Sequence, residues 1–137
     1  MSRIEWDDKF STNNSEIDAQ HKKWIGIYNK LHETLLRGKL PELLDVTVKT
    51  LKEIQDYANY HFKFEEDFMK SINYPHIVEH KRLHTDLDSK IYELNRDVRE
   101  GRAVLNTQVI KIMKNWIIDH ILEADKKYAE FYASIDK

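Results

Sequence analysis

The segment "SINYPHIVEHKRLH", residues 71–84, combines a chain turn with a row of histidines. Pro75 interrupts any helix that reaches it from the N-terminal side, because proline lacks an amide proton and its ring clashes with the preceding turn. After the proline, His76, His80 and His84 recur at every fourth residue, which places all three on one face of a helix. The segment therefore predicts two helices that meet at this turn, the second of them with a face that carries histidines.

Glycine and proline are rare in the chain, with 3 Gly and 2 Pro, and they mark the turns. Besides "SINYP", breakers lie in "RGKLP" (residues 37–41) and "EGRAVLN" (residues 100–106). Apolar residues between these turns recur at intervals of three and four, the period of an amphipathic helix. Ser15 is the expected N-cap of the first helix, with Asp18 closing a capping box. The expected helices cover approximately residues 15–37, 41–70, 75–99 and 106–134.

Four amphipathic helices joined by short turns favour an all-α fold, an up-down-up-down antiparallel four-helix bundle. A chain of 137 residues is long enough for one domain with a modest core, so we expect a single domain over residues 1–137. The bundle would take residues 15–137. Residues 1–14 remain as an N-terminal arm, which Trp6 and Phe10 are expected to pin to the bundle.

Composition excludes several classes of protein. The net charge is −2 and no basic patch argues for binding to nucleic acid. The chain has no cysteine, which rules out disulfides, thiolate zinc sites, iron–sulfur clusters and cysteine nucleophiles. No apolar run approaches the roughly 20 residues that a membrane span needs, and the N-terminal residues do not resemble a signal peptide. We therefore expect a cytoplasmic protein without membrane contact.

The turns bring histidines from all four helices to one level of the bundle. In an antiparallel helix pair, residues equidistant from the turn lie at about the same height. His61 and His84 are equidistant from the turn at residues 71–75. The same rule pairs His21 with His61 across the first turn, and His84 with His120 across the third. One layer of the bundle is therefore predicted to collect one histidine from each helix.

Two more candidate ligands lie close to this layer, and two histidines do not. Glu65 and His80 are one helical turn away, about 5.4 Å along the axis. The pairing rule gives His32 and His76 no partner of a ligand type, and we expect His76 at the surface where its helix starts. Scattered surface histidines are common, but a buried cluster of imidazoles and carboxylates without a metal would leave polar groups without partners. The cluster is therefore interpreted as a metal site.

Imidazole and carboxylate ligands suit iron, zinc, copper or nickel, and this ligand set is too large for one ion. Two six-coordinate ions that share two carboxylates and a bridging oxide or hydroxide would leave one coordination position open. Glu65 is one carboxylate, and the other must come from the fourth helix. On a regular helix Glu123 lies about 60° and Asp125 about 140° from His120, so spacing alone favours Glu123.

Four segments together resemble the hemerythrin family: "IDAQH" (17–21), "HFKFEE" (61–66), "EHKRLH" (79–84) and "DHILEAD" (119–125). The resemblance implies a non-haem di-iron site (Fe²⁺/Fe³⁺) that binds O₂ reversibly. The implied ligands are His21, His61, Glu65, His80, His84, His120 and Asp125. His80, His84 and His120 would hold one iron. His21 and His61 would hold the other iron, which keeps the open coordination position.

The resemblance implies that Glu65 and Asp125 bridge the two irons, together with an oxo or hydroxo group derived from solvent. This choice of Asp125 over Glu123 overrules the spacing argument. It requires a widened turn between His120 and Asp125, so we predict a π-helical distortion there.

The resemblance also implies an apolar pocket for O₂, with four lining residues: Phe62, Trp116, Ile117 and Tyr128. Ile117 is one turn before His120 and is expected over the open coordination position. A dry pocket would exclude water and protons and so slow autoxidation. The plain alternative for the aromatic residues of this set is core packing.

Several functions are compatible with such a site. The first is O₂ binding for carriage, storage or delivery, without catalysis. The second is O₂ or redox sensing, with readout through a partner or a longer chain. The third is a di-iron oxidase or peroxidase, against which the missing Glu-x-x-His motif of carboxylate-rich di-iron enzymes argues. A dizinc hydrolase would need a general acid or base in a polar cleft, and the pocket residues are apolar. The oligomeric state is left open.

Overall fold

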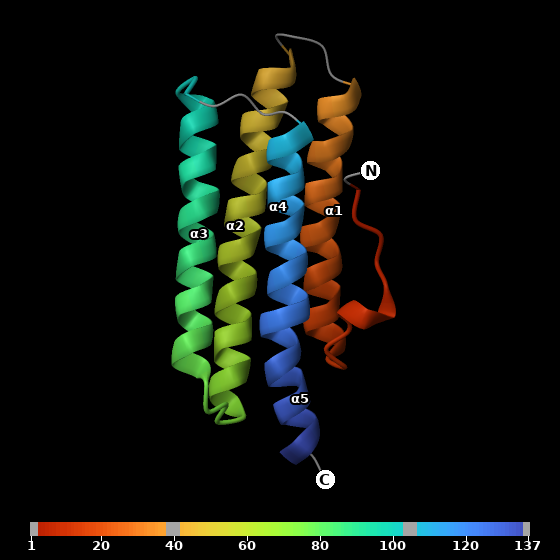
Figure 1. Cartoon of the computed structure of the whole chain (residues 1–137), viewed down its shortest axis with the longest axis vertical. Helices are drawn as coiled ribbons and strands as arrows, with labels where there is room; N and C mark the ends of the chain where they lie inside the picture. Colours follow the sequence, from red (N-terminus) through yellow and green to blue (C-terminus); the bar gives the residue numbers. More distant parts are fainter. Residues whose placement is uncertain (1–2, 38–41, 103–106, 136–137) are drawn as a thin grey trace.

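The computed structural model describes residues 3–37, 42–102 and 107–135. Within these ranges the chain forms an antiparallel bundle of long helices that run alternately up and down (Figure 1). In chain order they are α1 (Ser15–Arg37), α2 (Glu42–Ser71), α3 (Ile77–Arg99), and a last helix made of α4 (Thr107–Asp119), the π-helical η2 (His120–Asp125) and α5 (Lys126–Ile135). The predicted all-α four-helix bundle is confirmed.

The turn residues identified in the sequence end the helices through specific backbone geometry. Gly101 has a φ of 76°, a conformation that glycine adopts without steric cost. The amide of Gly101 donates to the carbonyl of Val98 and that of Arg102 to the carbonyl of Asp97, which is the Schellman arrangement. Asn73 takes a φ of 56° in the turn before α3. Gly38, Pro41 and Asn106, predicted to bound other helices, lie outside the described residues.

The predicted cap of α1 is wrong by one residue. Ser15 is the first residue of the helix, and the side-chain oxygen of Asn14 accepts from the amides of Glu16 and Ile17. Asp18 does not close a capping box. Its carboxylate instead accepts three hydrogen bonds from the arm, donated by the Ser11 hydroxyl and by the amide and hydroxyl of Thr12. Asparagine caps a helix as well as serine does, so residue type alone could not separate the two positions.

The N-terminal arm lies along α1 and is held by both apolar and polar contacts (Figure 1). Phe10, in the short helix η1 (Asp8–Phe10), is buried, and Trp6 packs against the core at partial exposure, as predicted. Sequence reasoning missed a second polar attachment of the arm, in addition to the one made by Asp18. The side chain of Asn29 both accepts from the amide of Ile4 and donates to its carbonyl, each at 2.9 Å.

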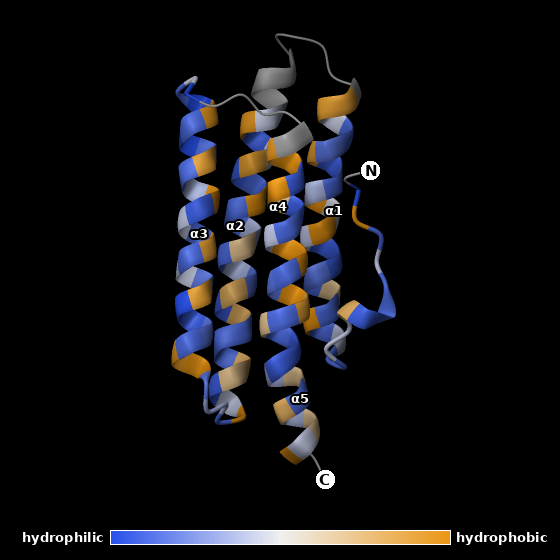
Figure 2. Ribbon diagram, in the orientation of Figure 1, coloured by the Kyte–Doolittle hydropathy of each residue, from blue (hydrophilic) through white to orange (hydrophobic). Residues whose placement is uncertain are grey.

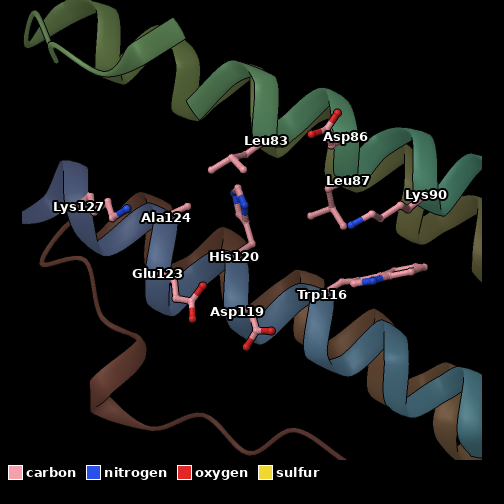
Figure 3. A pocket seen from close by; sticks show the side chains of 10 residues that line it. All are labelled: Leu83, Asp86, Leu87, Lys90, Trp116, Asp119, His120, Glu123, Ala124 and Lys127. Atoms are coloured by element: carbon pink, nitrogen blue, oxygen red, sulfur yellow. The ribbon is translucent and has the colours of Figure 1, made fainter. Parts of the chain in front are cut away.

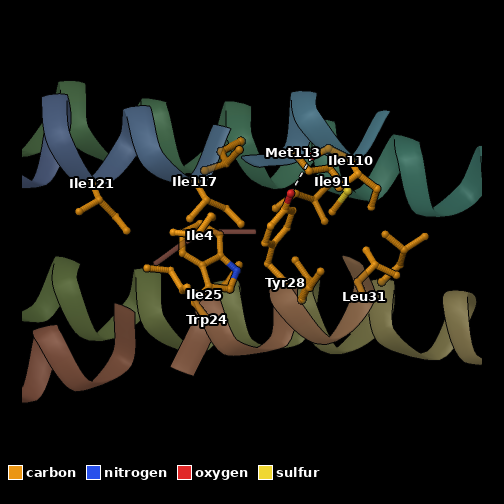
Figure 4. Packing of buried hydrophobic residues seen from close by; sticks show 14 of the residues in the cluster. Ile4, Trp24, Ile25, Tyr28, Leu31, Ile91, Ile110, Met113, Ile117 and Ile121 are labelled. Carbon is orange, nitrogen blue, oxygen red and sulfur yellow. Dashed lines mark hydrogen bonds between the residues drawn. The ribbon is translucent and has the colours of Figure 1, made fainter. Parts of the chain in front are cut away.

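Apolar and polar residues alternate along the helices (Figure 2), and many of the apolar ones are buried. They form two clusters of buried residues. The larger contains Trp24, Phe62 and Ile117 and fills one part of the bundle (Figure 4). The smaller contains Met69 and Tyr128. The predicted histidine layer lies near the boundary between the two clusters. No helix in the described ranges has the length and apolar character to cross a membrane.

Candidate metal centre

Two overlapping groups of buried side chains converge between the apolar clusters. One group consists of Glu65, His80, His84, His120 and Asp125. The other consists of His21, His61, Glu65 and Asp125. Within each group the potential ligand atoms lie within 4.8 Å of one another, and the two carboxylates belong to both groups. The structure thus brings together all seven residues that the sequence singled out, and separates their histidines into sets of three and two.

The shared carboxylates face both sets of histidines. Oδ1 of Asp125 lies 3.0 Å from Nε2 of His80 and 3.1 Å from Nε2 of His120, whereas Oδ2 lies 2.9 Å from Nε2 of His21. Oε1 of Glu65 lies 3.3 Å from Nε2 of His61. Each oxygen of Asp125 is therefore directed to a different set, which is the arrangement that a bridging ligand needs.

The buried atoms of the cluster lack the hydrogen bonds that they would need without a cation. Although the distances are short, Nε2 of His21, His61 and His80 has no hydrogen-bond partner among the described residues. The same holds for Oε1 of Glu65 and both oxygens of Asp125. Unpaired buried polar atoms are costly, and lone pairs that converge without pairing are satisfied by a shared cation. The residues present therefore fit a pair of metal ions.

The last helix widens where the second carboxylate is needed. Residues His120–Asp125 form the π-helix η2, so the predicted distortion is confirmed. Because a π-turn holds more residues than an α-turn, Asp125 comes round to the face of His120. Asp125 is fully buried. Glu123, which regular spacing favours, is exposed and lines a surface groove.

The two histidines that the pairing rule left out are also outside both groups. His76 is the N-cap residue of α3 and is exposed, as predicted. His32 is buried, but it lies on α1 three turns beyond His21 and is absent from either ligand group in the described part of the chain.

Two polar residues that sequence reasoning missed orient the candidate ligands. Nδ1 of His61 lies 2.7 Å from Oε1 of Gln20, and Nδ1 of His84 lies 2.8 Å from Oε2 of Glu66. Such outer partners fix the ring orientation and tautomer of a ligating histidine. Both directly adjoin a candidate ligand in the sequence. Adjacency to a ligand in the sequence could have indicated these two residues. It did not reveal the contacts, because neighbouring residues on a helix point in different directions.

The four predicted pocket residues do not lie together on one side of the centre. Phe62 stacks on the imidazole of His84, with ring centroids 4.0 Å apart and planes 9° apart. Ile117 is buried in the larger cluster, near Trp24 (Figure 4). Trp116 is only partly buried and faces outward, into a groove between α3 and α4 (Figure 3).

This groove borders the candidate centre, because His120 is among the residues that line it. It has a volume of about 410 Å³, and Figure 3 shows the His120 ring in it between α4 and Leu83 of α3. An adjoining hollow of about 380 Å³ is lined by His80 and shares Leu83 and Ala124. The three-histidine set therefore borders the surface. His21 and His61, by contrast, are fully buried.

Tyr128, the fourth predicted pocket residue, makes a direct contact with a candidate ligand. It is fully buried on α5, and its hydroxyl donates to Oε2 of Glu65 at 2.6 Å. Burial, together with the carboxylates of Glu65 and Asp125, raises the pKa of Tyr128 well above its usual value, which keeps the hydroxyl a donor.

We expect the Tyr128→Phe substitution to lower the free energy of unfolding of the metal-free protein by about 1.5–3 kcal/mol, the range for a hydrogen bond to a charged group. Tyr28→Phe is a matched control, because the Tyr28 hydroxyl donates to the neutral carbonyl of Ile110, and we expect a cost of about 0.5–1.5 kcal/mol. Urea unfolding measures both. Equal losses in the two variants would contradict a special role for the bond to Glu65.

In the metal-free protein, protons take part in holding the cluster together. Burial alone would lower the pKa of His21, but the adjacent carboxylates of Asp125 and Glu65 outweigh it and raise the pKa to about 10. The pKa of His120 is also raised, because the Asp125 and Glu65 carboxylates outweigh burial. Burial opposes ionisation of both carboxyls, yet the histidines hold the pKa values of Glu65 and Asp125 below their usual range.

These shifts predict how the stability of the metal-free protein depends on pH. The raised pKa of His21 contributes stability that is fully present below its ordinary value of 6.5 and is lost as pH rises through about 10. The lowered pKa values of Glu65 and Asp125 contribute stability that is present above 4.5 and 3.8, respectively, and is lost as pH falls below them.

We therefore expect the midpoint of thermal unfolding of the metal-free protein to be highest at about pH 4.5–6.5 and to fall toward pH 10. In the metal-loaded protein we expect no such fall above pH 6.5, because a cation takes the place of the protons. Differential scanning calorimetry at several pH values measures both. A metal-free protein that becomes more stable between pH 6.5 and pH 10 would contradict the prediction.

The fold and the cluster have counterparts among known proteins. Residues 12–132 match the family model described as the hemerythrin HHE cation binding domain. The bacteriohemerythrin of Clostridium acetobutylicum is 29% identical over 126 residues, which cover 91% of this chain and 98% of that protein. The bacteriohemerythrin of Methylococcus capsulatus is 32% identical over 120 residues, which cover 88% of each chain.

A solved structure shows the same fold. The crystal structure of a wild-type hemerythrin superposes with a TM-score of 0.83 at 30% sequence identity, and the match covers 93% of this chain and 95% of the other. The chain belongs to the hemerythrin family.

Proposed function

We propose that this chain binds dioxygen reversibly, for carriage, storage or delivery, at two iron ions held by the seven clustered residues. The observation that supports this most directly is the convergence of unpartnered buried ligand atoms in two sets that share both carboxylates. His80, His84 and His120 would hold one ion, and His21 and His61 would hold the other. Glu65 and Asp125 belong to both sets and would serve both ions.

Bound at this centre, two ferrous ions would supply the electrons that reversible dioxygen binding requires. The protein's part is to hold the ligands rigidly and to keep water away. Phe62 covers the face of His84, and Ile117 and Trp24 belong to the apolar cluster beside the two-histidine set. Tyr128 holds one oxygen of Glu65 by its hydrogen bond. By excluding water, these residues would limit the access of protons to the site and so slow irreversible oxidation.

An optical titration tests the proposal. The metal-free protein is reconstituted with Fe²⁺ under anaerobic conditions, iron per chain is counted, and O₂ is then admitted and removed in cycles. We expect two irons per chain and a charge-transfer absorption that appears with O₂ and fades on its removal. His80→Ala should lose this behaviour, whereas His76→Ala, a histidine on the exposed end of the same segment, should retain it.

Two results would contradict reversible O₂ binding. Iron that oxidises at once and never releases O₂ would instead support an oxidase, peroxidase or redox-sensing role. Absence of iron uptake would contradict the ligand assignment itself.

A further inference from the structure

The two halves of the cluster differ in the groups that support their histidines from outside. His61, in the two-histidine half, points its Nδ1 at the side-chain amide oxygen of Gln20, which is neutral. His84, in the three-histidine half, points its Nδ1 at a carboxylate oxygen of Glu66. The two contacts have nearly equal lengths, 2.7 and 2.8 Å, so the halves differ in charge rather than in geometry.

A carboxylate partner strengthens a ligand more than an amide partner does. A hydrogen bond to an ionised acceptor is roughly twice as strong as one between neutral groups. When the Nδ1–H of a ligating imidazole donates to a carboxylate, electron density at Nε2 rises and the nitrogen becomes a better ligand for a cation. Because Glu66 acts through His84 and contacts no ion itself, it is a positioning residue.

The surroundings of His84 make the effect of Glu66 larger than its partial exposure suggests. The Glu66 side chain is 24% exposed, in a notch of about 200 Å³ between α2 and α3. Phe62, however, lies flat against the His84 ring at a centroid distance of 4.0 Å and removes water from that face. Electrostatic interactions gain strength when water is excluded around them. The bond between Glu66 and His84 is thus half shielded from solvent.

From these contacts we infer that the centre has a strong half and a weak half, and that Glu66 makes the three-histidine half the first to bind a metal ion. This inference rests on the proposed ligand assignment and extends it. The three-histidine half offers one more imidazole, shares the same two carboxylates, and has the charged outer partner. A chain with one metal ion therefore carries it on His80, His84 and His120. The two-histidine half, supported by Gln20, fills second and empties first.

Stepwise Zn²⁺ binding to the metal-free protein tests the inference without any need for O₂. Competition calorimetry resolves two dissociation constants per chain. We expect the first ion to bind at least about tenfold more tightly than the second. Glu66→Gln, which keeps the shape and removes the charge, should weaken the first step about 10–100-fold and leave the second nearly unchanged. Gln20→Glu should strengthen the second step, and the double variant that exchanges the two residues should narrow the gap.

Asp67→Asn is the matched control. It removes one negative charge from the next position of α2, where the carboxylate pairs with exposed Lys63 and not with a histidine, and it should leave both steps unchanged. The order of filling is read from two ligand variants. His61→Ala should keep the tight step and lose the weak one, whereas His84→Ala should lose the tight one. Far-UV circular dichroism checks that each variant is folded. If Glu66→Gln does not fold, Gln20→Glu still tests the difference in affinity between the two halves.

Equal affinities for the two ions, an unchanged first step in Glu66→Gln, or an equal effect of Asp67→Asn would overturn the inference while leaving the O₂-binding proposal intact. Failure of O₂ release with the expected Zn²⁺ pattern would overturn only the O₂-binding proposal. Absence of any tight Zn²⁺ site would overturn both, because they share the ligand set.

Discussion

Asp125→Ala is expected to reduce the iron content from two ions per chain to one or none. Asp125 directs one oxygen toward His80 and His120 and the other toward His21, so its loss removes a ligand from both halves of the proposed centre. Loss of an outer partner already costs about 10–100-fold in metal affinity, and a shared ligand should cost more. Anaerobic titration with Fe²⁺, followed by metal analysis after gel filtration, measures the change.

Glu123→Ala is the control for this prediction. Glu123 is the carboxylate that regular helix spacing would select, and it lies exposed at the edge of the groove between α3 and α4. We expect the variant to bind two ions as the unaltered protein does. Loss of an ion in Glu123→Ala, with two ions kept in Asp125→Ala, would reverse the assignment of the second bridging carboxylate.

Ile117→Ala is expected to speed the irreversible oxidation of the ferrous protein in air. Ile117 is 2% exposed and belongs to the apolar cluster next to the histidine layer, one turn before His120. Removing most of its side chain opens space in that cluster, where water and protons could reach the centre. The rate of loss of the ferrous state, followed optically in air-saturated buffer, measures the effect. An unchanged rate would contradict a gating role for Ile117.

The same substitution should also lower the free energy of unfolding by about 2–5 kcal/mol, as is usual when a buried isoleucine is truncated to alanine. Ile110→Ala, at a fully buried position of α4 in the same cluster but farther from the centre, separates the two effects. It should lose a similar amount of stability and oxidise at the original rate. Faster oxidation in both variants would attribute the change to general loosening of the core.

The sequence predicted those features that follow from periodicity and from chain breakers. Helix boundaries came from the positions of glycine and proline, and α1 begins and ends at the predicted residues. The gathering of His21, His61, His84 and His120 followed from equal distances to the turns, which depends only on antiparallel packing. These are properties of a regular bundle, and they could be predicted without side-chain detail.

The remaining features depend on departures from regularity or on the direction of single side chains. Spacing alone would have chosen Glu123, because a regular helix turns Asp125 away from His120, and only the resemblance to a known family corrected this. The cap of α1 is Asn14 rather than Ser15. Residue type could not decide between them, because asparagine and serine cap helices equally well and the two residues are adjacent. The outward position of Trp116 depends on which side of the apolar stripe faces the groove. A periodic pattern does not fix that choice.

The place of the ligand layer within the bundle also affects how the protein opens. The buried polar groups separate a large apolar cluster, with Trp24 and Ile117, from a small one, with Met69 and Tyr128. In the described part of the chain, this polar layer lies at the boundary between the small cluster and the large one. Proteins open locally in contiguous cooperative units, and units with few buried apolar contacts open at the lowest free energy. In native-state hydrogen exchange, the end of the bundle that contains α5 and the start of α3 should therefore open as a separate unit. Metal binding should join the two into one cooperative block.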